Sequence, residues 1–364
     1  MFEIIFLIAV SLYFIQTVLF IIGAAKTYPK ISEDKLPTVS VIVAARNEEN
    51  NILDCLTSLN DLSYPEGKIQ IIIVDDKSTD NTGKIIDEFI LDKSKFLKVI
   101  TQKNIGELKG KTLAIANGIE QATGEIIMTT DADCIVSLTW AKTIASYYIS
   151  DDVAIVNGMT NQQENNSFAA MQSVDFIYLL TVASGSINLG KPLSCIGNNM
   201  SYRRSVYDEI GGYTSLKFSV TEDFNLLMAT HKLKKYKIIY PVDVGALVTS
   251  KPCSSIKSLY RQKKRWSVGG MESDFAGYFV MTAGFISHVC IMLIPFFYST
   301  SVLLLFAFKV FIDYFFLAPV YRKLNLELKL KDFIVFEIYF ILYVFIIPFI
   351  LLFDRNVVWK GRNY

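Results

Sequence analysis

Residues 69–76 read IQIIIVDD, and this stretch decides the fold. Its continuous apolar run is typical of a strand that is buried on both faces of a parallel sheet. The polar residues that follow end the strand, and Ser78, Thr79 or Asp80 is expected to cap a helix over residues 81–90. The stretch therefore predicts a buried strand that passes directly into a helix.

The same alternation of strand and helix continues on both sides of this stretch. Residues 39–44 form a β-branched run, and residues 47–59 carry apolar side chains at helical spacing. Further along, we expect a strand over residues 96–101, a helix over 111–122 and a strand over 126–130. The order β-α-β-α-β predicts an α/β fold with an open, mainly parallel sheet that is covered by helices.

Polar clusters follow three of the expected strands: Asn47-Glu48, Asp75-Asp76 and Asp131-Ala132-Asp133. Open parallel sheets bind ligands beyond the carboxyl ends of their strands. These clusters are therefore expected to share one binding edge. A GxGxxG sequence does not follow the first strand, which disfavours a dinucleotide-binding Rossmann domain.

Long apolar segments lie at both ends of the chain. Residues 4–23 are uncharged and long enough to cross a bilayer, and Lys26 and Lys30 after them place the following block on the cytosolic side. Residues 277–319 are expected to hold two spans, 277–296 and 298–318, and residues 333–353 a further one. Both flanks of the last segment are basic, which favours a re-entrant or interfacial segment there.

The composition narrows the function classes. Hydrophobic residues make up 52% of the 364 residues, and the formal net charge of +1 gives no basic face for nucleic acid. The five cysteines are scattered and the two histidines lie far apart in the sequence. A disulfide framework and a zinc cluster are therefore disfavoured, and we expect a bound metal to be held by carboxylates.

Carboxylates at the strand ends suggest a cation and a nucleotide. Asp131 and Asp133, two residues apart, suit a divalent cation that also binds phosphate oxygens, although a solvated turn would place them equally well. Asp75 and Asp76 suit hydrogen bonds from a base or a ribose, or ordinary turn chemistry. Lys111 near a helix start suits a phosphate, or it belongs to a solvated lysine cluster.

Two later motifs each allow a functional and a structural interpretation. Thr221-Glu222-Asp223 opens an apolar helix, where acidic residues are favoured, and one of its carboxylates is also placed to act as a general base. Residues 262–266 read QKKRW, with Gln262 and Arg265 on one helix face beside Trp266. Arginine grips a diphosphate and tryptophan offers a flat face, but a basic, aromatic belt beside a membrane has the same composition.

Taken together, these motifs resemble the family 2 glycosyltransferases, the group that includes cellulose, chitin and hyaluronan synthases and ceramide glucosyltransferase. The resemblance runs from residue 38 to about residue 268 and rests on seven pieces in the same order: VSVIVAARNEENNI, IIIVDDKSTDNT, KGKTLAIANGI, GEIIMTTDADC, IGNNMSYRR, TEDFNL and QKKRW.

The resemblance implies a GT-A type nucleotide-binding sheet flanked by helices, with N- and C-terminal transmembrane helices. It implies that Asp223 is the catalytic base and that Asp131 and Asp133 bind Mn²⁺ or Mg²⁺. It also implies contacts to a nucleotide-sugar donor, expected to be a UDP-sugar, from Ala45, Asn47, Glu48, Asp75, Asp76, Lys111, Asp131, Gln262, Arg265 and Trp266. The acceptor side would be lined by Gly197, Asn198, Asn199 and Glu222.

We therefore expect an inverting, metal-dependent transfer of a sugar to a membrane-associated acceptor. The few expected spans, and a tail (WKGRNY) that resembles bacterial enzymes acting on lipid-like acceptors, favour a lipid; a short or processive β-linked oligo- or polysaccharide is the alternative. A transporter and an inactive nucleotide-binding scaffold are the rival classes. The expected domains are an anchor (1–25), a cytosolic catalytic domain (36–275) and C-terminal membrane helices with a basic tail (276–364), in a bacterial plasma membrane.

Overall fold

The protein is described by a computed structural model that covers residues 1–101, 104–217, 219, 221–271, 273–356, 358–359 and 362–363. Its contacts divide the chain into two interleaved units. The sheet unit comprises Thr27–Asn161 and Cys195–Lys251, and the helical unit comprises Met1–Lys26, Gln162–Ser194 and Pro252–Tyr364. Phe218 and Val220, which precede Glu222, and Lys360, Gly361 and Tyr364 of the WKGRNY tail lie outside the described residues.

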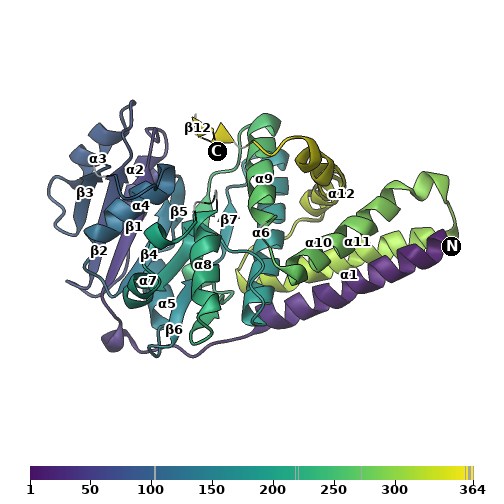
Figure 1. Ribbon diagram of the computed structural model, residues 1–364, viewed down its shortest axis with the longest axis horizontal. Helices are drawn as coiled ribbons and strands as arrows, with labels where there is room; N and C mark the ends of the chain where they lie inside the picture. Colours follow the sequence, from purple (N-terminus) through teal and green to yellow (C-terminus); the bar gives the residue numbers. More distant parts are fainter. Residues whose placement is uncertain are drawn as a thin grey trace. The chain divides into compact units, whose positions relative to one another are not determined.

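The sheet unit alternates strands and helices along the chain (Figure 1). Its elements are η1 (Glu33–Lys35), β1 (Val39–Ala45), α2 (Ile52–Asn60), β2 (Ile69–Asp75), α3 (Thr82–Ile90), β3 (Phe96–Ile100), α4 (Gly110–Glu120), β4 (Ile126–Asp131), β5 (Cys134–Val136), α5 (Trp140–Ser146), β6 (Val153–Asn157), β7 (Thr160–Gln162), η2 (Gly197–Asn199), β8 (Met200–Arg203), α7 (Arg204–Glu209), η3 (Tyr213–Ser215), α8 (Glu222–Lys232), β9 (Lys237–Ile239), η4 (Val244–Ala246) and β10 (Val248–Ser250).

Within the described residues, the main sheet has seven strands in the order β3-β2-β1-β4-β8-β6-β9. The strands β3, β2, β1 and β4 are parallel, whereas β8 runs antiparallel to both β4 and β6. The α/β fold with a mainly parallel sheet is therefore confirmed. A smaller sheet, in the order β5-β10-β7, accompanies it.

Alternating side chains of the central strands bury both faces of the main sheet. Val39, Val41 and Val43 of β1 belong to one core cluster together with apolar residues of α2 and α5. On the other face, α4 packs closely enough that a Cβ added at Gly118 would lie 2.8 Å from Cγ2 of Ile42. This two-faced burial explains why the strands read as continuous apolar runs instead of alternating ones.

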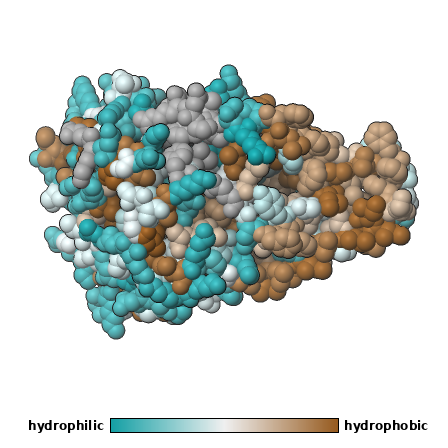
Figure 2. Space-filling model, in the orientation of Figure 1, coloured by the Kyte–Doolittle hydropathy of each residue, from teal (hydrophilic) through white to brown (hydrophobic). Residues whose placement is uncertain are grey.

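The helical unit carries the apolar ends of the chain. Its elements are α1 (Phe2–Ala25), α6 (Ser167–Asn188), α9 (Ile256–Gly270), α10 (Phe275–Met292), η5 (Ile294–Phe296), α11 (Thr300–Lys323), α12 (Leu330–Phe353), β11 (Val358–Trp359) and β12 (Arg362–Asn363). Helices α1, α10 and α11 run side by side, and apolar residues dominate their visible surface (Figures 1 and 2).

Within the described residues, five helices are long and apolar enough to cross a membrane: α1, α6, α10, α11 and α12. Four of them correspond to the expected segments, and the region 277–319 is indeed broken into two helices, around Pro295 in η5. Helix α6 was not expected. It is the most buried of the five, at 83% of its apolar window, because it packs against α1 and α12.

One local expectation was wrong. Helix α3 was expected to be capped by Ser78, Thr79 or Asp80, but its N-cap residue is Asn81, whose side chain makes no capping bond. Asp80 instead accepts a hydrogen bond from the Thr82 amide through Oδ1 and from the Glu49 amide through Oδ2. The carboxylate therefore ties two loops together instead of serving as the N-cap residue.

Candidate active site

The sheet brings three of the sequence-predicted clusters to one edge. In the parallel register, Ala45 at the end of β1 lies opposite Asp75 at the end of β2, and Ala44 lies opposite Asp131 at the end of β4. Adjacent strands in a sheet are about 4.8 Å apart. The backbone register alone therefore places both acidic clusters beside the end of the first strand.

The turn after β1 is joined to the turn after β2 by hydrogen bonds. Asn47 adopts a left-handed backbone with φ of 54°, and its Oδ1 accepts the Thr79 amide at 2.8 Å. The Asn47 amide donates to Ser78 Oγ at 3.1 Å, and the Glu48 amide donates to Thr82 Oγ1 at 2.7 Å. Glu48 in turn accepts from the Asn51 side chain at 2.6 Å. The two turns thus form one preorganised wall of the edge.

Asp75 and Asp76 are both buried in this wall. Asp75 Oδ1 accepts the Ser78 amide at 2.9 Å. Arg46 lies over Asp76, donating to its carbonyl at 2.8 Å and approaching its carboxylate at 3.6 Å. A carboxylate held in this way can accept hydrogen bonds from a base or from ribose hydroxyls without first being ordered.

Lys111 lies between carboxylates from two different elements. Its Nζ is 2.6 Å from Asp131 Oδ1 and 3.5 Å from Glu222 Oε1. Burial by itself lowers the pKa of Lys111, but the carboxylates of Asp131 and Glu222 outweigh it and raise this pKa above its ordinary value. The side chain therefore stays cationic beside Asp131, at the first turn of α4.

Asp131 and Asp133 lie on either side of a sharp bend between β4 and β5. Burial raises the pKa of the Cys55 and Cys134 thiols, and the negative charges of Asp133 and Asp131 raise it further. Both thiols are thus kept protonated. Both thiols adjoin the acidic bend, since Cys55 Sγ lies 3.6 Å from the Asp131 carbonyl oxygen and Cys134 Sγ lies 3.6 Å from Asp133 Oδ1.

Helix α8 presents Glu222 and Asp223 in its first turn, as the sequence predicts. Asp223 Oδ1 accepts the Phe224 amide at 2.8 Å, which orients the carboxylate. Gly197 in η2 approaches the same carboxylate so closely that an added Cβ would lie 3.2 Å from Asp223 Oδ2. The absence of a side chain at residue 197 therefore leaves space beside the carboxylate.

The two residues after Gly197 are engaged in the interior. Asn199 accepts from the Trp140 indole at 2.9 Å and donates to the carbonyls of Met159 and Ala246 at 2.7 and 2.9 Å. Asn198 Oδ1 accepts from Thr160 Oγ1 at 2.9 Å. These bonds give both residues a supporting role, and their direct contact with an acceptor stays a prediction.

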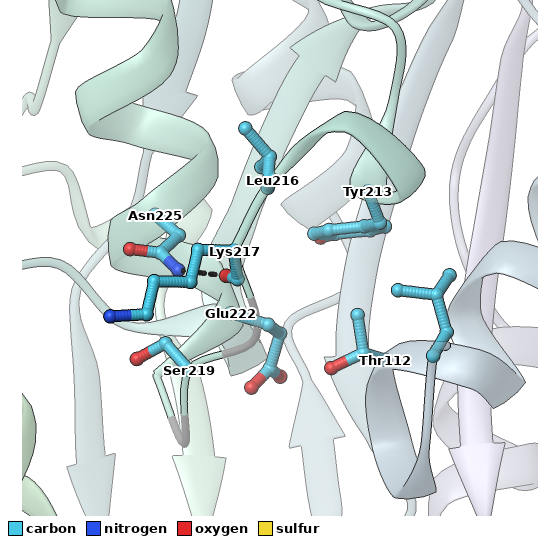
Figure 3. Close-up of a pocket in the computed structure, with 8 residues that line it drawn as sticks. Thr112, Tyr213, Leu216, Lys217, Ser219, Glu222 and Asn225 are labelled. Atoms are coloured by element: carbon cyan, nitrogen blue, oxygen red, sulfur yellow. Dashed lines mark hydrogen bonds between the residues drawn. The ribbon is translucent and has the colours of Figure 1, made fainter. Parts of the chain in front are cut away.

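A shallow cleft opens beside Glu222, with about 230 Å³ of empty space that is partly open to solvent. In Figure 3 the oxygen atoms of Glu222 and Thr112 point to the same side of the cleft. Asn225 donates a hydrogen bond to the Lys217 carbonyl at 2.8 Å on another wall. Sequence reasoning missed Thr112, Tyr213 and Asn225 as lining residues, although Thr112 follows Lys111 directly and Asn225 lies in the quoted segment TEDFNL.

Family models identify the chain. The model for glycosyl transferase family 2 matches residues 40–211, and that for glycosyl transferase family group 2 matches residues 126–353. The protein is a family 2 glycosyltransferase. The expected family is thereby confirmed, as is its enzyme class.

Known proteins resemble this glycosyltransferase in sequence and in fold. A β-monoglucosyldiacylglycerol synthase of Nostoc sp. is 29% identical over 67% of the chain and 51% of its own length. A poly-β-1,6-N-acetyl-D-glucosamine synthase of Staphylococcus aureus is 26% identical over 67% of the chain and 57% of its own length. The chain thus spans little more than half of these curated relatives.

The fold likeness extends over almost the whole chain. A mannosyltransferase from Pyrobaculum calidifontis, solved with GDP-Man and Mn²⁺, matches with a TM-score of 0.66 at 16% identity. The match covers 98% of this glycosyltransferase and all of that chain. The GT-A type of sheet expected from the sequence is therefore confirmed.

The acidic bend of the glycosyltransferase supplies some, but not all, of the ligands that a divalent cation needs. Within the described residues, no group of three histidine, cysteine or acidic side chains converges on one point. Asp131 and Asp133 supply hard carboxylate oxygens, which suit Mn²⁺ or Mg²⁺, and the remaining ligands must then come from a bound diphosphate or water. This donor set matches a cation that enters together with a nucleotide.

Gln262, Arg265 and Trp266 of the QKKRW motif belong to the helical unit, on α9. The expected i, i+3 pair of Gln262 and Arg265 does lie on one continuous helix. Trp266 is half-buried and stacks on Phe176 of α6, with ring centroids 5.6 Å apart. The contact of this motif with a donor stays a prediction.

Proposed function

We propose that this glycosyltransferase transfers a sugar from a UDP-sugar, with inversion, to a hydroxyl of a membrane lipid. The observation that carries the proposal is the single edge at which Asp75, Asp131 and Lys111 meet the first turn of α8. Acidic groups for a nucleoside and a cation, a buried ammonium for phosphates, and a carboxylate for an acceptor proton are all found within the sheet unit.

In this proposal, Asp75 and Asp76 accept hydrogen bonds from the nucleoside. Asp131 and Asp133 hold Mn²⁺ or Mg²⁺, which supplies positive charge to the diphosphate leaving group. Lys111 keeps its proton, as the elevated pKa requires, and its ammonium adds charge stabilisation where the leaving group becomes more negative. The buried turns after β1 and β2 hold these groups without further ordering.

The bond changes follow from the same residues. A carboxylate oxygen of Asp223 accepts the proton of the acceptor hydroxyl while the oxygen of this hydroxyl attacks the anomeric carbon. The bond from the anomeric carbon to the diphosphate oxygen breaks in the same displacement, so the configuration inverts and the electron pair leaves with UDP. The proton ends on Asp223, whose orientation is supported by the Phe224 amide and the space at Gly197.

Two features support a lipid acceptor. The five apolar helices offer a bilayer surface, and the relative from Nostoc is named as a synthase of a glucosylated diacylglycerol. The name of the relative from Staphylococcus aureus supports the second candidate, a β-linked polysaccharide synthase. The two candidates differ in product, since the first adds one sugar and the second adds many.

The test is a donor panel. The purified full chain in detergent is incubated with UDP-sugars, Mn²⁺ and a membrane lipid extract, and UDP release is measured alongside lipid mass spectra. We expect metal-dependent UDP release and a lipid that gains one hexose mass. A product series that carries increasing numbers of sugars would overturn single transfer to a lipid and support the polysaccharide synthase. Absence of release with every donor, while nucleotide still binds, would overturn the transfer and favour an inactive scaffold.

A further inference from the structure

The two residues between Gln262 and Arg265 in the QKKRW motif are lysines, and both are buried. Lys263 is 2% exposed and Lys264 is 6% exposed. In a basic belt beside a membrane, the ammonium groups would reach for water or lipid headgroups. The side chains of these two lysines are instead buried inside the helical unit. Their burial requires partners, because an isolated buried ammonium is strongly unfavourable.

The Lys263 ammonium is enclosed by one carboxylate and two aromatic rings. It forms an ion pair with Asp175 of α6, and each of these two side chains is only 2% exposed. The ammonium also lies 4.8 Å from the ring centroid of Trp266 and 5.2 Å from that of Tyr343 in α12. Three helices of the unit, α6, α9 and α12, therefore meet at this one charge.

The Trp266 ring contacts one residue of its own helix and one residue of α6. Lys263 precedes it by three residues and lies on the same face of α9, at a distance suited to a cation–π contact. Phe176, the residue after Asp175, stacks on the ring at an interplanar angle of 29°. Helix α6 thus contributes both the ring that contacts Trp266 and the carboxylate that holds the cation beside it.

We propose that Asp175 is a positioning residue for Trp266: by pairing with Lys263 it fixes the orientation of the tryptophan ring that the reaction uses. The inference rests on the proposed function and on the expectation, implied by the family resemblance, that Arg265 and Trp266 contact the nucleotide-sugar donor. Asp175 touches no substrate in this scheme. It acts through Lys263, from a helix that has no recognisable motif of its own.

The neighbouring pair provides a matched control. Lys264 pairs with Asp354 at 2.5 Å, but the Asp354 side chain is 52% exposed. An ion pair that is open to solvent contributes little, whereas breaking a buried pair leaves an uncompensated charge. The two lysines are adjacent on α9. Replacing Asp175 or Asp354 by asparagine therefore removes the carboxylate partner of one lysine and leaves the other pair intact. Only the Asp175 pair also contacts the Trp266 ring.

The experiment compares Asp175→Asn with Asp354→Asn in the full chain in detergent. We expect Asp175→Asn to lower kcat by about 10- to 100-fold, as misplacement of a group in the site does, while KM for the nucleotide sugar stays within about twofold. Asp354→Asn should leave both constants near wild type. Asp175→Glu, which keeps the charge, should recover most of kcat.

A second readout does not depend on activity. Acrylamide quenching of the fluorescence of Trp266 is obtained by subtracting the same measurement made in a Trp266→Phe background. We expect stronger quenching of Trp266 in Asp175→Asn and unchanged quenching in Asp354→Asn. This arm reports on the ring even if the wild type transfers no sugar, so failure of the proposed function is distinguishable from failure of this inference.

The double variant Asp175→Asn/Lys263→Met covers the case in which the single variant does not fold. It removes both charges, so thermal stability should return toward wild type, but the ring loses its cation and kcat should remain low. Recovery of both stability and kcat in the double variant would mean that the pair is only structural and would overturn the proposal. Unchanged Trp266 quenching or unchanged kcat in a folded Asp175→Asn protein would overturn it as well.

Discussion

At the residue scale, the site consists of charges whose positions depend on one another. Lys111 contacts Asp131 and Glu222, and the latter is followed directly by Asp223. Lys111 therefore pairs with one carboxylate that the proposed cation would use. An ammonium and a divalent cation compete for the same oxygen atoms. Loading of the cation should consequently depend on the arrival of a diphosphate that takes over Lys111.

Replacing Lys111 tests this competition. In Lys111→Met, we expect Mn²⁺ to bind more tightly in the absence of nucleotide, because the ammonium that contacts the Asp131 carboxylate is gone. UDP should bind more weakly, because the phosphates lose the ammonium that the proposed function assigns to them. Mn²⁺ binding is followed by electron paramagnetic resonance and UDP binding by calorimetry. Equal Mn²⁺ affinity in the variant and the wild type would contradict the competition.

Replacing Asp223 tests the proposed base. Asp223→Asn keeps the size and the hydrogen bond from the Phe224 amide, but its amide cannot accept the acceptor proton as a carboxylate does. We expect kcat to fall by about 10²- to 10⁴-fold, the usual contribution of general base catalysis. UDP binding, measured in parallel, should stay unchanged. Full turnover in this variant would remove Asp223 from the base role.

At the element scale, helices of the helical unit approach each other through glycine. A Cβ added at Gly185 of α6 would lie 2.4 Å from the Phe20 carbonyl oxygen of α1, and one at Gly23 would lie 2.1 Å from the Gly185 oxygen. Small residues that allow such backbone approach are typical of helix pairs in membranes. The contact explains how α6 is buried without a long apolar face of large side chains.

Gly185→Ala should therefore destabilise the protein, because the added methyl group meets backbone that cannot move aside. Gly284→Ala in α10 is the matched control, since a Cβ at Gly284 meets nothing within 4 Å. Alanine is favoured over glycine in a helix interior by about 0.5–1 kcal/mol, so the control should be neutral or slightly stabilising. Thermal unfolding of both variants in detergent measures the difference. A fall in melting temperature that is equal in both would show that the close approach does not matter.

A buried ionic cluster joins α1, α11 and α12. Lys309 of α11 lies 2.6 Å from Asp313 and 2.9 Å from Glu337 of α12, and Tyr13 of α1 donates to Asp313 at 2.5 Å. Lys309→Met leaves two buried carboxylates without their cation. We expect a loss of about 3–5 kcal/mol, as for other broken buried pairs, measured by thermal unfolding. Lys309→Arg keeps the charge and should be milder; equal stability of the methionine variant and the wild type would contradict this account.

At the scale of the whole molecule, the linear sequence and the packing divide the chain differently. Helix α6 lies within the expected catalytic range 36–275, but it packs against α1 and α12. A fragment of residues 36–275 would therefore expose the surface of α6 that these helices cover. We expect this fragment to aggregate in size-exclusion chromatography without detergent, whereas the full chain stays monodisperse in detergent. A soluble, monodisperse fragment would support 36–275 as an independent domain.

The sequence by itself determined the four parallel strands β1 to β4 and the polar edge at which they end. Runs such as IQIIIVDD encode a buried strand and its polar end locally, and parallel register then aligns Asp75 and Asp131 beside the end of β1 without further information. The four apolar segments at the chain ends were readable for the same reason, since their signal is continuous along the chain.

Only the tertiary structure decided the partners of individual side chains. The pairing of Lys111 with Asp131 and Glu222 joins residues far apart in the sequence, and so does that of Lys263 with Asp175. Helix α6 was not predicted because its four serines, Thr181 and Gly185 dilute the apolar signal that marks a span. Such contacts depend on which helices pack together, and this is fixed by close backbone approach and buried charge instead of by any local pattern.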